Sequence, residues 1–164
     1  MRKEMPHGCA LMVVDSVTSN TALEIDVEVI ARVAKEEFGC KQVLVDGAHA
    51  LGQCDVNWDR MKEAGVDWFV TNAHKWFSSP RGLAILCASP TVQPQTRPLT
   101  RSHGIRDGFT SSFVWDGCRD YAPILTFPFL ASMWKKISSP CLHTPTYTTE
   151  LLKEAVTLLE TSWG

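Results

Sequence analysis

Two short polar clusters hold most of the side chains in this sequence that could do chemistry, and each directly follows an apolar run. Asp46 and His49 follow VLV, whereas Asn72, His74 and Lys75 follow WFV. A lysine becomes a nucleophile when burial or a nearby cation favours its neutral amine, which then forms a Schiff base with a carbonyl compound. A carboxylate such as Asp46 could pair with the protonated nitrogen of a heteroaromatic ring, and an imidazole could stack on that ring.

Each of these residues has a more ordinary interpretation when it is taken alone. An aspartate at a strand end is usually a cap or turn residue, a loop lysine is usually solvated, and a histidine usually has a structural role. The combination indicates a site, because the carboxyl ends of parallel strands meet at the edge where α/β proteins bind ligands. Since Trp76 and Phe77 follow Lys75, we also expect partly apolar surroundings for its amine.

The segments around these clusters alternate between strand and helix patterns. The apolar runs do not alternate with polar residues, so we expect strands buried on both faces of a mostly parallel sheet. Asp26 is the expected N-cap and Gly39 the expected stop of an amphipathic helix. No helix separates the last two strands, which predicts either an antiparallel pair or an elaborated loop. The expected strands cover residues 10–15, 43–46, 68–71 and 83–88, and the expected helices cover 27–38 and 59–64.

The second half of the sequence has a different composition. Residues 89–112 are rich in Pro, Thr, Ser and Arg, which predicts a long loop of the kind that is usually functional or mobile. Residues 121–137 predict a helix with prolines in its first half, residues 138–149 an irregular stretch, and YTTELLKEAVTLLETSWG a terminal amphipathic helix that starts at residue 147.

Composition and charge exclude several classes of protein. A net charge of −2 gives no electrostatic basis for binding nucleic acid or an anionic membrane. No apolar run approaches the roughly 20 residues that span a bilayer, and the short apolar stretch near the start is better explained as a buried strand than as a signal peptide. The six cysteines have irregular spacing without a CxxC pair, which predicts reduced cysteines in a cytoplasmic protein without a metal site.

The stretch VLVDGAHALGQCDVNWDRMKEAGVDWFVTNAHKWFSSPRGLAIL resembles the cofactor-binding core of the class V aminotransferases, which are pyridoxal-phosphate (PLP) enzymes of fold type I. It is most similar to the isopenicillin-N-epimerase-like branch and is related to the cysteine desulfurases. The resemblance implies an α/β fold, a partial large domain over residues 1–120 with a mostly parallel sheet and flanking helices. Residues 121–164 would be helices that lead into the small C-terminal domain.

The resemblance also implies a role for each residue of the two clusters. Lys75 would hold PLP as a Schiff base and move protons at the α carbon of a small amino-acid substrate. Asp46 would pair with the pyridinium nitrogen, and His49 would lie against the ring. His74 would contact the phosphate, and Asn72 would lie near the phosphate or the Schiff base.

Two further segments match the family pattern. VVDSVTSNTALEIDVEVI resembles the preceding strand and loop, where Ser19, or Thr18 beside it, would approach the ring oxygen. SSFVWDGCRDYAPIL resembles the segment that reaches the cofactor phosphate of the neighbouring subunit, so we expect a homodimer in the full-length protein. Cys118 stands where the family has threonine, and because a thiol is a weak donor this phosphate contact is weakened.

Several functions remain open from the sequence. An aminotransferase-like or epimerase-like reaction ranks above cysteine desulfuration, because the neighbours of Cys118 do not form a flexible loop. Family members are considerably longer than this chain, so we expect a fragment that binds PLP poorly or not at all on its own. The alternative is an inactive fragment or paralogue that serves as a binding or dimerisation module. A nucleotide-binding domain is disfavoured, because no GxGxxG or GxxxxGK[ST] motif follows a strand.

Overall fold

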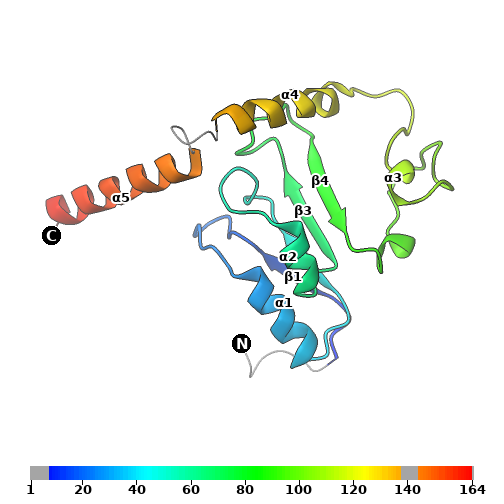
Figure 1. Ribbon diagram of the computed structural model, residues 1–164, viewed down its shortest axis with the longest axis horizontal. Helices are drawn as coiled ribbons and strands as arrows, with labels where there is room; N and C mark the ends of the chain where they lie inside the picture. The colour runs from blue at the N-terminus through cyan, green and yellow to red at the C-terminus, as the bar shows by residue number, and fades with distance from the viewer. Residues whose placement is uncertain (1–7, 138–143, 164) are drawn as a thin grey trace.

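The computed structural model describes residues 8–137 and 144–163, and its centre is an open sheet of four strands (Figure 1). The sheet order is β1-β2-β3-β4, in which β1, β2 and β3 are parallel and β4 is antiparallel to β3. The four predicted strands are therefore confirmed, and the last pair is antiparallel. The bounds are β1 Met12–Asp15, β2 Val43–Asp46, β3 Trp68–Asn72 and β4 Ala84–Ala88.

Two helices connect the parallel strands, and both have the caps that their sequences indicate. In α1 (Val27–Glu36), the Asp26 carboxylate accepts a hydrogen bond from the Val29 amide, as predicted. In α2 (Trp58–Glu63), the Asn57 side chain accepts from the Arg60 amide. Gly65 ends α2 in the left-handed region, at φ +99°.

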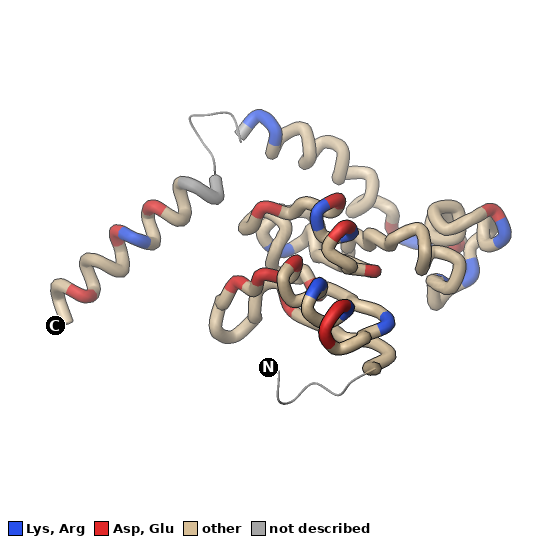
Figure 2. Tube along the Cα trace, turned by 60° about the horizontal axis from the view of Figure 1, so that its bottom comes forward, with Lys and Arg blue, Asp and Glu red and all other residues tan. Residues whose placement is uncertain are grey.

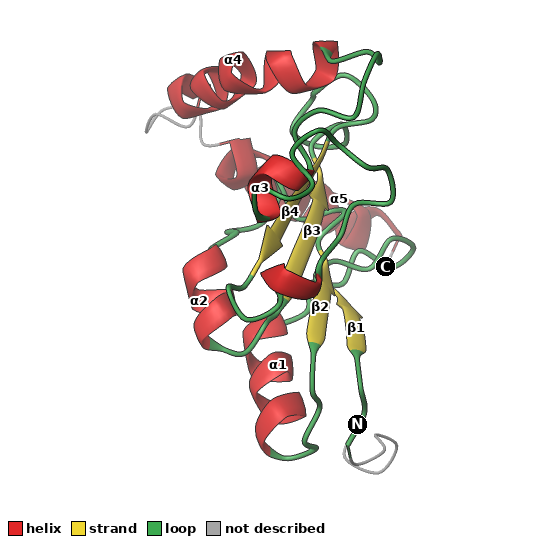
Figure 3. Cartoon of the chain, turned by 90° about the vertical axis from the view of Figure 1, so that its right-hand side faces the viewer, coloured by secondary structure: helices red, strands yellow, loops and turns green. Residues whose placement is uncertain are grey.

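Both helices lie on the same side of the sheet (Figure 3). The core forms between these helices and the sheet. There Val43, Val45 and Phe69 of the strands are fully buried, together with small helical residues such as Ala31 and Ala34. Phe69 reaches this core because side chains along a strand alternate between the two faces of the sheet.

The prediction that the strands are buried on both faces is wrong for the edge strands. Val13 of β1 is 60% exposed, and Ala84 of β4 is also exposed. The physical reason is that α1 and α2 cover a single face, so residues that point to the other face stay accessible in the described structure. A continuous apolar run is therefore compatible with a strand that only one layer of helices covers.

The predicted loop at 89–112 is mostly irregular but contains two short helical turns, η1 Gln93–Gln95 and α3 Phe109–Ser112. It leads to α4 (Ala122–Ile137), which confirms the predicted helix and includes Pro128. Trp134 of α4 stacks on Phe77 with ring centroids 5.1 Å apart and donates its indole N–H to the Phe77 carbonyl oxygen. This contact attaches α4 to the segment that follows Lys75.

The last helix, α5 (Thr144–Trp163), begins earlier than predicted. Of the stretch predicted to be irregular, residues 138–143 lie outside the described residues, and residues 144–149 are helical. The helix projects away from the sheet (Figure 1), and all its residues from 147 to 163 are exposed.

Acidic and basic residues are interspersed over the half of the molecule that contains the sheet (Figure 2). Lys35 of α1 forms an ion pair with the Asp67 carboxylate at 2.7 Å, and both side chains are largely buried. No helix in the described ranges combines the length and the apolar character needed to cross a membrane.

Candidate active site

The two predicted clusters come together at the carboxyl edge of the parallel strands. Asp46 ends β2 and lies in register with Asp15 on one side and Val70 on the other. Beyond the strand end, the Gly47 amide donates to the Val70 carbonyl at 2.7 Å, and the Thr71 hydroxyl donates to the Gly47 carbonyl at 2.6 Å. These bonds fix the segment after β2 against the end of β3.

Glycines allow the two loops to approach this closely. A Cβ on Gly47 would overlap the buried ring of Phe69. Gly52 has φ +87°, and a Cβ there would lie 3.2 Å from the backbone carbonyl of Trp76. A side chain at position 52 would therefore combine backbone strain with a contact against the main chain next to Lys75.

His49 connects the two loops through both of its ring nitrogens. Its Nε2 lies 3.1 Å from the Lys75 Nζ, and its Nδ1 accepts from the Trp76 indole N–H at 3.4 Å. A neutral imidazole has one N–H. With Nδ1 accepting from Trp76, Nε2 is the ring nitrogen that faces the Lys75 Nζ. This contact places an imidazole beside the Lys75 amine, the group that could attack a carbonyl carbon.

The Asp46 carboxylate is half-buried and has one oxygen in use. Its Oδ1 accepts from the Ala48 amide at 2.9 Å, which forms an Asx turn and orients the group. Its Oδ2 accepts no hydrogen bond from any residue in the described part of the chain. A carboxylate held in this way can still receive a proton-bearing ring nitrogen.

His74 is half-buried, and its Nδ1 lies 3.0 Å from the Leu83 carbonyl oxygen. Because a carbonyl can only accept, Nδ1 carries the hydrogen, and in the neutral ring Nε2 has only a lone pair. His74 would therefore donate to a phosphate oxygen through Nε2 only as an imidazolium.

The structure does not bring the other predicted residues into this bonded group. Ser19 is exposed in the loop after β1, where the neighbouring Thr18 hydroxyl accepts from the Leu23 amide. Asn72 ends β3 and is half-buried, and Cys118 is exposed. Within the described ranges, none of these three side chains forms a hydrogen bond with Asp46, His49 or Lys75. Lys75 is itself exposed, and Trp76 is 50% exposed, so the expected apolar enclosure of the amine is not formed by the described residues.

Sequence reasoning missed three residues that organise the site. Trp76 was expected only as an apolar neighbour, but its indole N–H contacts His49. Thr71 and Gly52 were not singled out, although they hold the two loops together. Glycine within a polar cluster was the available signal for Gly52, since it often marks a close backbone approach.

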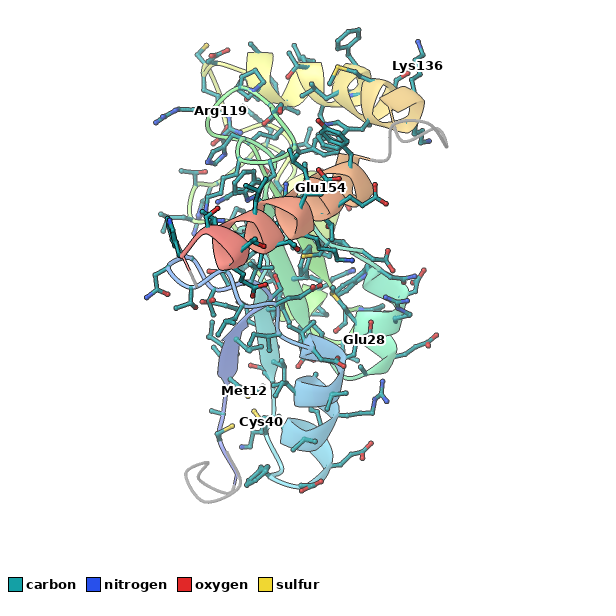
Figure 4. The ribbon with its side chains drawn as sticks, turned by 90° about the vertical axis from the view of Figure 1, so that its left-hand side faces the viewer. Met12, Glu28, Cys40, Arg119, Lys136 and Glu154 are labelled. Atoms are coloured by element: carbon teal, nitrogen blue, oxygen red, sulfur yellow. The ribbon has the colours of Figure 1, made fainter. Side chains whose placement is uncertain are left out.

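A separate cleft of about 570 Å³ lies beside α1 and α2, and none of the predicted site residues lines it. Arg60 pairs there with Glu28, which Figure 4 labels on α1, and with Asp55. Burial, together with the nearby Glu24, raises the pKa of the Cys54 thiol in this cleft to about 11. The chemistry of the carboxyl edge gives no role to this cleft.

Comparisons with known proteins identify the family of this chain. A family model described as Aminotransferase class-V matches residues 1–112. An L-cysteine desulfhydrase of Arabidopsis thaliana is 34% identical over 119 residues, which cover 72% of this chain and 25% of that protein. An L-cysteine desulfhydrase-like protein of Epichloe uncinata is 36% identical over 140 residues, which cover 72% of this chain and 29% of that protein.

Solved structures show the same fold. The apo cysteine desulfurase of Thermococcus onnurineus NA1 superimposes with a TM-score of 0.74 at 19% identity, covering 92% of this chain and 38% of that one. The cystine C–S lyase C-DES, in complex with its product cysteine persulfide, gives a TM-score of 0.67 at 18% identity, covering 84% of this chain and 38% of that one. The predicted partial large domain of PLP fold type I is thus confirmed. The chain spans between a quarter and a third of the length of the two curated relatives.

Proposed function

Because this chain belongs to the aminotransferase class-V family, whose members depend on PLP, we propose that its full-length protein uses Lys75 to act at the α carbon of a small amino acid. The observation that carries the proposal is the contact between the Lys75 Nζ and the His49 Nε2 at 3.1 Å. The amine lies at the sheet edge where β2 ends at Asp46, and the bond from Trp76 orients the His49 ring that contacts it.

The donor set of this edge fits PLP. An amine suits the aldehyde carbon, a half-buried carboxylate with one unused oxygen suits the ring nitrogen, and an imidazole suits the ring face. When bound, PLP withdraws electrons from the bonds of the substrate α carbon. Asp46 would hold a proton on the ring nitrogen, Lys75 would remove and return the proton at the α carbon, and His49 would orient the amine. His74, Asn72, Ser19 and Cys118 stay predicted cofactor ligands.

The test is reductive trapping of PLP on the full-length protein. Borohydride after incubation with PLP is expected to leave a phosphopyridoxyl group on the peptide that contains Lys75. Lys75→Ala is expected to abolish the label, whereas Lys62→Ala, which removes an exposed lysine paired with Asp59, is expected to keep it. Equal labelling of wild type and Lys75→Ala would contradict the assignment.

The reaction that follows proton removal has two candidates. The first is an epimerase-like outcome, which needs only removal and return of the proton at the α carbon, or an aminotransferase-like one, which also needs a second half-reaction with a keto acid. Cleavage of a C–S bond in cysteine is the second, and the similarity to L-cysteine desulfhydrases supports it about as well. In D₂O, all of these reactions exchange the α hydrogen. Release of sulfide from L-cysteine would select the lyase, and amino transfer to a keto acid would select the aminotransferase.

A desulfurase mechanism would need a cysteine nucleophile, and among the cysteines that the structure describes Cys118 is the exposed one. We expect Cys118→Ser to keep most sulfide release if the protein is a lyase. Cys118→Thr is expected to tighten PLP binding, because a hydroxyl is the stronger donor. Loss of sulfide release in both variants would instead favour a persulfide-forming desulfurase.

We also propose that the full-length protein is a homodimer in which the segment around Cys118 reaches the partner's cofactor. The alternative is an inactive fragment that serves as a dimerisation module. Light scattering tests for the dimer that both alternatives expect, and borohydride trapping distinguishes them, because the enzyme is expected to trap PLP on Lys75 and the module is not. A monomeric full-length protein would contradict both.

A further inference from the structure

Two cysteines that the proposed chemistry does not use lie against each other at the opposite end of the sheet. Cys9 precedes β1 and Cys40 precedes β2, and their Sγ atoms are 2.7 Å apart. Figure 4 labels Cys40 near the amino ends of these strands, below Met12. The sulfur atoms of a disulfide lie about 2.04 Å apart, so a small side-chain movement separates these thiols from a covalent bond.

The two chain segments that carry these cysteines are already joined by backbone hydrogen bonds. The Lys41 amide donates to the Cys9 carbonyl, and the Met12 amide donates to the Gln42 carbonyl, each at 2.9 Å. These bonds continue the parallel pairing of β1 and β2 toward their amino ends. A disulfide between Cys9 and Cys40 would therefore follow the existing register, and the two chain segments would not have to move closer to each other.

The two thiols differ in accessibility, which gives them different roles in an exchange reaction. Cys40 is only 3% exposed, and its thiol donates to the Gln42 carbonyl at 3.2 Å. Cys9 is half-buried and donates to the Cys40 sulfur. That hydrogen bond and burial raise the pKa of the Cys9 thiol, which keeps the reactive thiolate scarce near neutral pH. Exchange through Cys9 is therefore slow near neutral pH.

We propose that Cys9 and Cys40 form a reversible disulfide by exchange with small-molecule disulfides of the glutathione type. The Cys9 thiolate attacks one sulfur of the reagent, which releases one thiol and leaves a mixed disulfide. The Cys40 thiolate then attacks the Cys9 sulfur and releases the second thiol. Two protons and two electrons pass from the protein thiols to the reagent, so no further oxidant is needed.

The bond would fasten an edge strand to the sheet. In the described structure β1 pairs only with β2, and it leads into the loop that carries Ser19. The bond would join positions 31 residues apart and restrict the unfolded chain. We expect the oxidised protein to melt roughly 5–10 °C above the reduced one.

The experiment equilibrates the full-length protein with graded ratios of oxidised to reduced glutathione, then quenches it with acid and alkylates the free thiols. Trypsin cuts after Lys3, Arg32, Lys35 and Lys41, so the bond joins peptides 4–32 and 36–41. Mass spectrometry is expected to find this linked pair, and the equilibrium constant is expected to be at least tenfold larger in the native state than in urea.

Cys40→Ser is expected to remove the linked peptide and the rise in melting temperature, and Cys118→Ser, which changes an exposed cysteine, is expected to keep both. The wild-type linked peptide does not depend on how well a variant folds. Only glutathionylated Cys9 in the wild type, or an equal equilibrium constant in urea, would overturn the proposal. Neither result depends on PLP or on Lys75.

Discussion

The side chain of His49 links Lys75 to Trp76, because each of its two ring nitrogens contacts one of these residues. Nδ1 accepts from the Trp76 indole, and Nε2 lies 3.1 Å from the Lys75 Nζ. Trp76 would act on Lys75 through its contact with His49, so we assign it as a positioning residue.

Trp76→Phe keeps an aromatic ring and removes the indole N–H. We expect Lys75 of the full-length protein to react with PLP roughly 3- to 10-fold more slowly, in line with the loss of one weak hydrogen bond. The rise of the absorbance of the covalent PLP complex measures this rate.

Trp68→Phe is the matched control, because Trp68 lies at the amino end of β3, away from the site, and its indole donates to the Thr96 hydroxyl. Its PLP reaction rate is expected to equal that of wild type. An unchanged rate in Trp76→Phe would show that the tautomer of His49 does not depend on Trp76.

At the scale of elements, close packing of the two loops sets the site geometry. Gly52→Ala is expected to destabilise the chain by about 1–2 kcal/mol through backbone strain, and to move Trp76 away from His49. Gly82→Ala has the same kind of strain, at φ +90°, but nothing lies within 4 Å of its added Cβ.

Comparing the two glycine variants separates strain from contact. Both are expected to lower the melting temperature, and only Gly52→Ala is expected to slow PLP trapping on Lys75. Equal trapping in both variants would mean that the approach of Gly52 to Trp76 does not position the lysine.

The buried carboxylate of Asp67 connects three elements. Its Oδ2 accepts from the Lys35 ammonium and from the Val43 amide, each at 2.7 Å, and Lys35 also donates to the Lys41 carbonyl. Asp67→Ala leaves a partly buried cation and a buried amide without this acceptor. We expect a loss of about 2 kcal/mol in the free energy of unfolding, measured by urea denaturation. Glu63→Ala, on the surface of α2, is expected to change it by less than about 0.5 kcal/mol.

On the scale of the whole molecule, α5 stands apart from the folded core. Its apolar residues are exposed, including Leu151 and Leu158, which are 51% and 68% exposed. We expect removal of residues 138–164 to leave the melting temperature of the chain within roughly 2 °C, because little buried area is lost, and to reduce its self-association in light scattering. A large fall in melting temperature would show that α5 packs on the core.

The sequence alone determined the order and type of the elements in the sheet half of the chain. Each apolar run is bounded by strong local signals, such as the Asp26 cap and Gly65, so local propensity and tertiary structure agree there. The motif around Asp46 and Lys75 also identified the family and its cofactor, because residue types at fixed spacing are a property of the chain itself. The division into domains at residue 120 stays a prediction.

Only the tertiary structure decided which side chains meet. His49 contacts Lys75 and Trp76, and Cys9 contacts Cys40, although the residues of each pair are 26 to 31 positions apart in the sequence. Sequence spacing does not encode these contacts, since they depend on the parallel register of β1, β2 and β3 and on glycines that let two loops touch. The exposed faces of β1 and β4 have the same origin, because burial depends on which layers cover a strand and not on its own residues.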